Sequence, residues 1–152
     1  DYYGKPAIYP TLCVGRIMSA QPLSDGRSNI LLQGLERCDI QEEHFEKPYR
    51  EATIQLKPQP SEERLAAGVR RAMVELLSRY LQTREGNTVW QGFFREEVSD
   101  DVLVNTLSTY LECTPLEKQF LLEADGLLQR ARRLNDLIQF MLHDRQGAGG
   151  WE

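Results

Sequence analysis

The spacing of apolar residues changes near residue 60. Before that point, apolar side chains come in short runs that alternate with polar ones, as in β-strands, and six of the seven prolines lie there. From 61 to 145, leucines recur every three or four residues among Arg, Glu and Gln, with a single proline, as in amphipathic helices. The pattern predicts an α+β chain in which the β part comes first.

Three strands are predicted in the first part of the chain. The first covers 12–20 and the second 29–40, and Asp25-Gly26 between them supplies a turn. A loop that holds His44 leads to a third strand at 49–56. Three strands form a sheet but do not close it, so we expect something to cover its edges.

The second strand contains the residues expected to form the core of this sheet. Ile30, Leu32 and Leu35 are the predicted core positions. Gly34 interrupts this aliphatic run and is predicted to be a bulge or a point of close approach.

Four amphipathic helices are predicted in the second part. Ser61 is the expected N-cap of the first, which runs to Gln82, and Ser99-Asp100-Asp101 starts the second. Residues 114–117, "TPLE", form a capping box with proline at the first helical position. The last helix covers 126–143. The apolar positions at helical spacing in the first two helices are Leu65, Val69, Met73, Leu76, Leu77, Tyr80, Val102, Leu103, Leu107, Tyr110 and Leu111.

The last helix has one apolar stripe, with three arginines mostly off it. The stripe consists of Leu127, Ala131, Leu134, Ile138 and Met141. Arg130, Arg132 and Arg133 can contact an anion, but a solvated helix face with i,i+4 partners is the favoured interpretation. The glycines at 147, 149 and 150 are expected to end the helix.

Aromatic residues gather between the first two helices. Trp90, Phe93 and Phe94 are predicted to anchor a core from a short helix or buried loop, which is favoured over a role as the floor of a binding groove.

Charge and composition narrow the function classes. The formal net charge is -5 and the pI about 5.2, which argues against a general nucleic-acid binder. No apolar run approaches the ~20 residues that span a bilayer. The three cysteines are widely spaced and odd in number, without a CxxC pair, so neither a zinc site nor a disulfide framework is expected. A reducing cytoplasm is the expected compartment.

The sequence contains no strong candidate for a catalytic site. A Cys38–His44 nucleophilic pair is conceivable, but Cys38 is better interpreted as a small buried hydrophobe, and His143 lies far along the chain. The acidic pairs are interpreted as solvated faces and helix starts rather than metal ligands; they are Glu42-Glu43, Glu96-Glu97 and Asp100-Asp101. No catalytic, cofactor-binding or metal-ligating residue is therefore assigned.

Two segments resemble a known family, the N-terminal domain of the ATP-dependent protease Lon. The first is "CVGRIMSAQPLSDGRSNILLQGLERCDI" followed by "KPYREATI", and the second is "PLEKQFLLEADGLLQRARRL". The residues that carry the resemblance are Gly15, Arg16, Ile17, Asp25, Gly26, Arg27, Asn29 to Leu32, Gly34, Leu35, Arg37, Pro48 to Arg50, Glu117, Lys118, Gln119, Leu122, Glu123 and Arg130.

The resemblance implies a PUA-like β pseudo-barrel, partial here, followed by a small helical bundle. The expected domains are 1–60 for the β part and 61–152 for the bundle with its Gly-rich tail. In the family this module precedes the ATPase and serine–lysine protease parts and helps to select unfolded or tagged polypeptides. We therefore expect a non-catalytic domain whose partners are such polypeptides and a protease.

The sequence departs from the family pattern at two places, and each departure bears on what kind of protein this is. The family's opening strands are not found before residue 12, so open sheet edges are expected to allow self-association. The last helix stops at "HDRQGAGGWE", which favours a stand-alone Lon-domain protein over a fragment of a full Lon protease. A PUA-like RNA-binding module is a further alternative, and the acidic balance argues against it. No individual substrate-binding residue can be named from the sequence.

Overall fold

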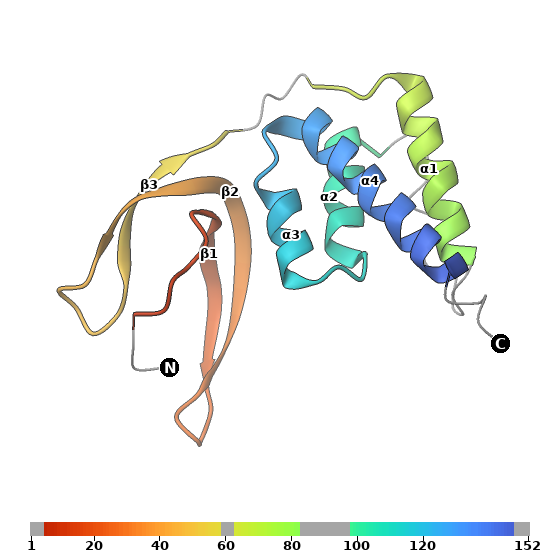
Figure 1. Cartoon of the computed structure of the whole chain (residues 1–152). Coiled ribbons are helices and arrows are strands. Elements are labelled where there is room, and N and C mark those ends of the chain that lie inside the picture. The colour runs from red at the N-terminus through yellow and green to blue at the C-terminus, as the bar shows by residue number, and fades with distance from the viewer. Residues whose placement is uncertain (1–4, 59–62, 83–97, 148–152) are drawn as a thin grey trace. The chain divides into compact units, whose positions relative to one another are not determined.

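The computed structural model describes residues 5–58, 63–82 and 98–147. The chain divides into two compact units, Asp1–Pro58 and Gln59–Glu152. The first contains strands β1 (Thr11–Pro22), β2 (Ser28–His44) and β3 (Glu51–Leu56). The described part of the second contains helices α1 (Ala67–Gln82), α2 (Asp100–Tyr110), α3 (Pro115–Leu122) and α4 (Gly126–Gly147) (Figure 1). The predicted α+β class is confirmed.

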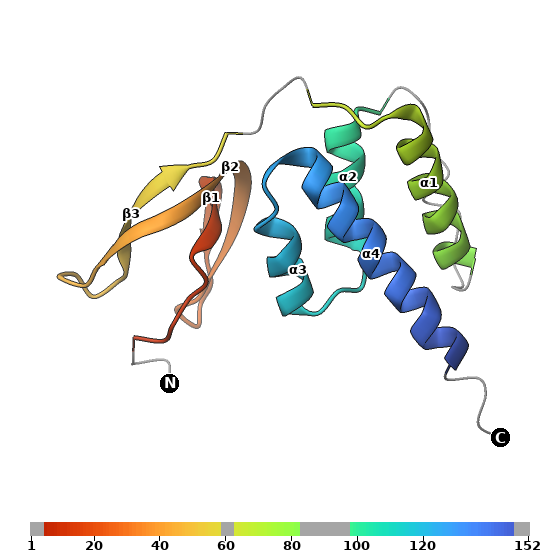
Figure 2. The same cartoon turned by 45° about the horizontal axis from the view of Figure 1, so that its top comes forward.

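The β unit is an antiparallel sheet in the order β1-β2-β3. The long β2 lies in the centre, and Figure 2 shows β3 running beside its second half. Among the described residues, β1 and β3 each pair with β2 only, so the sheet is open and not a closed barrel.

The β1–β2 hairpin turns where Asp25-Gly26 predicted a turn. Gly26 has a φ of 85°, a left-handed conformation that glycine adopts without strain. The Leu23 amide donates to the Arg27 carbonyl at 2.7 Å, and the Asp25 carboxylate accepts the Arg27 amide at 3.1 Å. The turn is therefore held by both main-chain and side-chain bonds.

Register shifts interrupt the ladder at three points. β2 has an extra residue at Leu35, between the pairs Val14–Glu36 and Gly15–Gly34, and another at Gln41. β1 has one at Met18. The bulge predicted at Gly34 thus lies directly beside it. The close approach is at Gly15, where a Cβ would lie 3.0 Å from the Gln33 carbonyl oxygen.

The predicted core of the second strand was wrong. Ile30, Leu32 and Leu35 are 53%, 56% and 51% exposed, because no described element of this unit covers that part of the hairpin. His44 ends β2 instead of lying in a loop, and β3 begins at Glu51 instead of residue 49. Only the far end of the hairpin provides a completely buried apolar side chain, Cys38.

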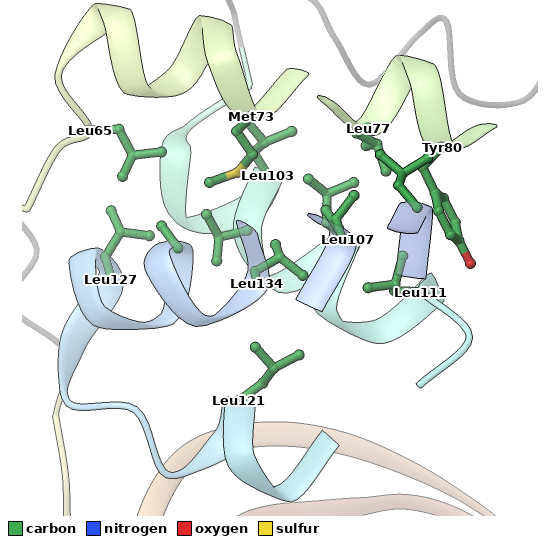
Figure 3. Close-up of a cluster of buried hydrophobic side chains, with 14 residues drawn as sticks. Leu65, Met73, Leu77, Tyr80, Leu103, Leu107, Leu111, Leu121, Leu127 and Leu134 are labelled. Carbon is green, nitrogen blue, oxygen red and sulfur yellow. The ribbon is translucent and has the colours of Figure 1, made fainter. Parts of the chain in front are cut away.

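The helical unit has a closed core. Figure 3 shows side chains from α1, α2, α3 and α4 pointing toward one another. The buried members of this cluster are Leu65, Met73, Leu77, Tyr80, Leu103, Val104, Leu107, Leu111, Leu121, Leu127, Ala131, Leu134, Ile138 and Leu142. Four of the five predicted stripe positions of α4 are among them, and the fifth, Met141, is partly buried. Three apolar positions predicted for α1 and α2 are about half exposed or more, namely Val69, Val102 and Tyr110.

Three of the four predicted helix starts are confirmed, because α4 begins at Gly126 and both α2 and α3 begin at their predicted caps. Ser99 caps α2 by accepting the Val102 amide. Thr114 and Glu117 form the reciprocal capping box at the start of α3, with Pro115 in the first turn. Because these signals involve residues three positions apart, they act without help from the rest of the fold.

The predicted start of α1 was wrong, since residues 63–66 are not helical and the helix begins at Ala67. The segment is bound elsewhere: the Leu65 amide donates to the buried Asp100 carboxylate at 2.8 Å, and Glu63 accepts the Leu127 amide at 2.5 Å. Glu63 thereby caps α4. Helix α4 runs to Gly147, four residues beyond the predicted His143. The prediction for Trp90, Phe93 and Phe94 falls outside the described residues.

Candidate functional site

The β1–β2 hairpin exposes an unusual amount of apolar surface. Six large side chains within it are more than half exposed, and they are Ile17, Met18, Ile30, Leu31, Leu32 and Leu35. We call these six residues the hairpin patch. A gathering of exposed apolar side chains on a folded domain indicates a site of interaction.

The register gives this patch two sides. Ile17 pairs with Leu32 and Ala20 with Ile30, so these four residues lie on one side of the hairpin. Ser19 pairs with Leu31, which therefore lies on the other side. The extra residue Met18 keeps Ile17 and Ala20 on the same side although they are three positions apart.

Strand β1 adds a main-chain feature to the patch. It is a twelve-residue strand at the edge of the sheet. An edge strand presents a row of N–H and C=O groups to which another extended segment can bond. A polypeptide can therefore bond to the β1 backbone and contact the patch side chains at the same time.

The structure does not bring Cys38 and His44 together. Both lie on β2, six positions and thus about 20 Å apart along the strand. Burial raises the pKa of the Cys38 thiol, which disfavours the reactive thiolate. His44 Nε2 lies 2.8 Å from Thr53 Oγ1. The interpretation of Cys38 as a buried hydrophobe is confirmed.

The acidic pairs have structural partners. Glu43 forms an ion pair with Arg50 at 3.2 Å. Asp100 starts α2 as predicted, but it is 7% exposed instead of solvated and forms an ion pair with Arg70. Glu96-Glu97 lies outside the described residues. In the ranges described, no group of three or more His, Cys, Asp or Glu side chains could hold a metal ion.

The arginines of α4 differ from one another. Arg130 is only 4% exposed and donates to Asn105 Oδ1 at 2.6 Å, so its assignment to a solvated face was wrong. Arg132 is exposed. Arg133 lies 4.3 Å over the Phe120 ring and donates to the Phe120 carbonyl. Two of the three arginines are thus engaged within the helical unit.

Sequence reasoning named none of the hairpin patch as a binding residue, and it assigned three of its members to the core. An alternating apolar strand reads the same whether its apolar side faces a core or solvent. The unusual signal is Leu31, an apolar residue directly between two others, which no single-sided strand can bury.

The fold defined here, an open antiparallel sheet followed by a helical bundle, is that of Lon N-terminal domains. The N-terminal domain of Mycobacterium avium complex Lon protease is similar with a TM-score of 0.64 and 20% identity, over 89% of this chain and 73% of that one. A Lon N-terminal domain protein from Xanthomonas campestris is similar with a TM-score of 0.59 and 17% identity, over 86% of this chain and 68% of that one. At such identities the likeness concerns the fold.

The family follows from a match in sequence. The family model described as "ATP-dependent protease La (LON) substrate-binding domain" matches residues 3–139, and the chain belongs to this family. The resemblance seen in the two sequence segments is thereby confirmed. No curated protein matches the chain. Among the described helices, none is both long and apolar enough to cross a membrane.

Proposed function

We propose that this chain is a non-catalytic module that captures extended polypeptide segments for ATP-dependent proteolysis. The observation that carries the proposal is the hairpin patch, in which six large apolar side chains stand exposed beside an open strand edge. Membership in a family of Lon substrate-binding domains supports protein, rather than a small molecule, as the ligand.

The mechanism is strand addition to β1. An unfolded segment forms main-chain hydrogen bonds with the β1 edge, and these bonds do not depend on the sequence of the segment. Its alternate side chains lie beside Ile17, with Leu32 one strand further in on the same side, and removal of this apolar surface from water favours binding. Main-chain pairing combined with a small apolar contact gives weak, sequence-tolerant capture, which suits a module that handles many unfolded or tagged proteins.

Bond cleavage belongs to a partner in this proposal. Cys38 is buried, and His44 lies far from it along β2. Hydrolysis of ATP and of the peptide bond would be supplied by ATPase and protease parts, and this module would raise the local concentration of substrate beside them.

Fluorescence anisotropy tests the proposal. The full chain is titrated into a labelled unfolded polypeptide and, at the same salt concentration, into a labelled RNA of similar length. We expect saturable binding of the polypeptide with little response to RNA. The double variant Ile17→Ser/Leu32→Ser should weaken polypeptide binding about tenfold, since it removes two apolar contacts.

A matched control is Leu128→Ser, because Leu128 is also an exposed leucine, at 43%, but belongs to the helical unit. It should leave binding unchanged. Sedimentation of the chain alone separates self-association through β1 from substrate binding. RNA binding with a steep salt dependence, or equal loss in both variants, would overturn the proposal.

A further inference from the structure

Arg16 differs from every other basic residue in the described part of the β unit. Residues 5–58 contain seven Lys and Arg side chains. Arg27, Lys47, Arg50 and Lys57 form ion pairs, Lys5 lies 4.0 Å over the Phe45 ring, and Arg37 is also engaged. Within residues 5–58, only Arg16 has no such partner.

Arg16 forms no ion pair with an acidic side chain in the described part of the β unit. It is the one charged residue of β1, whose sequence is TLCVGRIMSAQP. Its cross-strand partner is the uncharged Gln33, and the neighbouring pairs on that side are Ser19–Leu31 and, beyond the extra residue Leu35, Val14–Glu36. An exposed guanidinium thus lies in the middle of an edge strand, and Glu36 is the one acidic side chain in the pairs beside it.

The register fixes how Arg16 would meet an added strand. Arg16 and Leu31 lie on one side of the hairpin, and Ile17, Ala20, Ile30 and Leu32 on the other. Because side chains of an added strand alternate in the same way, one residue lies on the Arg16 side and its two neighbours lie on the Ile17 side.

We infer that the β1 edge prefers extended segments with the pattern apolar–acidic–apolar. The carboxylate of Asp or Glu pairs with the Arg16 guanidinium, and the flanking apolar side chains lie on the Ile17–Leu32 side. A lysine at the central position is repelled, and a glutamine is neutral. The inference rests on the proposed function and adds to it a substrate class.

The geometry of the guanidinium supports a carboxylate as its ligand. Its N–H groups form a planar fork that matches the two oxygens of a carboxylate. The pair would stay exposed to solvent, so the expected discrimination is modest, and salt should weaken it.

The test uses three short labelled peptides in which valine and threonine alternate and the central threonine is replaced by Glu, Gln or Lys. Each is titrated into the full chain at low salt. We expect the Glu peptide to bind about two- to fivefold more tightly than the Gln peptide, and the Lys peptide to bind most weakly. In Arg16→Gln the Glu and Gln peptides should bind equally, and Arg16→Lys should retain most of the preference.

Arg27→Gln is the matched control, because Arg27 is an exposed arginine of the same hairpin that is already paired with Asp25. It should keep the full preference for Glu. Far-UV circular dichroism establishes that each variant is folded. Equal binding of the Glu and Gln peptides to the wild-type chain would overturn the preference while leaving polypeptide capture intact. Binding of none of the three peptides, to a chain that also fails to bind unfolded polypeptide, would overturn both proposals.

Discussion

In the helical unit Leu103, Leu127 and Leu134 are completely buried, whereas in the β unit Leu31 and Leu32 are more than half exposed. In both units the sequence has apolar residues at the regular spacing expected for its helices or strands. The helices can turn their stripes toward one another, so four short elements close a core. A sheet has two faces, and the described strands provide nothing to cover the hairpin. The helical unit thus buries its apolar side chains, whereas the β unit leaves those of its hairpin exposed.

Replacing one leucine in each unit tests this contrast most directly. Leu134→Ala should destabilise the helical unit by about 2–5 kcal/mol, because it leaves a cavity in a closed core. Leu32→Ala should change stability by less than about 0.5 kcal/mol, since that side chain is already in water. Urea unfolding followed by circular dichroism measures both. A comparable loss in the two variants would mean that the hairpin is covered in solution.

The buried carboxylate of Asp100 gives the next largest effect. It accepts the Leu65 amide at 2.8 Å and pairs with Arg70, which also donates to the Val98 carbonyl at 2.9 Å. Asp100→Asn should cost about 1–3 kcal/mol, because a buried charge loses its counter-charge. The exposed Asp136 of α4 is the control, and Asp136→Asn should be neutral. Equal thermal midpoints for the two variants would contradict the buried network.

The cap supplied by Glu63 should contribute less. It accepts the Leu127 amide, and its carboxylate lies against Gly126 at the start of α4. Glu63→Ala should cost about 1 kcal/mol and speed hydrogen exchange of the Leu127 amide. Glu75→Ala, at an exposed site within α1, provides the comparison. Unchanged exchange at Leu127 would show that the cap does not form.

The smallest expected effect is on how the stability of the β unit depends on pH. The hydroxyl of Thr11 donates to Asp39 at 2.6 Å and lowers the pKa of that carboxyl below its ordinary 3.8. Since the folded pKa is the lower one, the stabilisation is complete above the unfolded value and is lost as pH falls through the folded one. Thr11→Val should flatten this dependence. An acid titration followed by the NMR signals of β1 and β2 measures it, and identical profiles would refute it.

The features that could be predicted from the sequence are those with nearby causes. The Thr114–Glu117 capping box and the buried α4 stripe depend on residues one turn apart, and both were found. Asp100 and Arg130 were misjudged because their burial depends on Leu65 and Asn105, which lie 35 and 25 residues away. From the sequence alone, a polar side chain is predicted to be exposed unless its distant partner is known.

The hairpin patch shows the converse error. The alternating pattern correctly predicted a strand. The error was to assume that each of its apolar residues is buried in a core. Whether Ile30 and Leu32 are buried depends on a second layer, and no property of the strand itself encodes that layer.

The extra residue Met18 limits how long a strand that adds to β1 can stay bound. Regular pairing can follow β1 on either side of this bulge but cannot pass it without slipping register. The uninterrupted contact therefore stays only a few residues long, and its short lifetime would let a captured segment leave before it becomes a permanent part of the sheet. In the proposed capture, this extra residue would keep the added strand from extending into the continuous pairing that seeds aggregation.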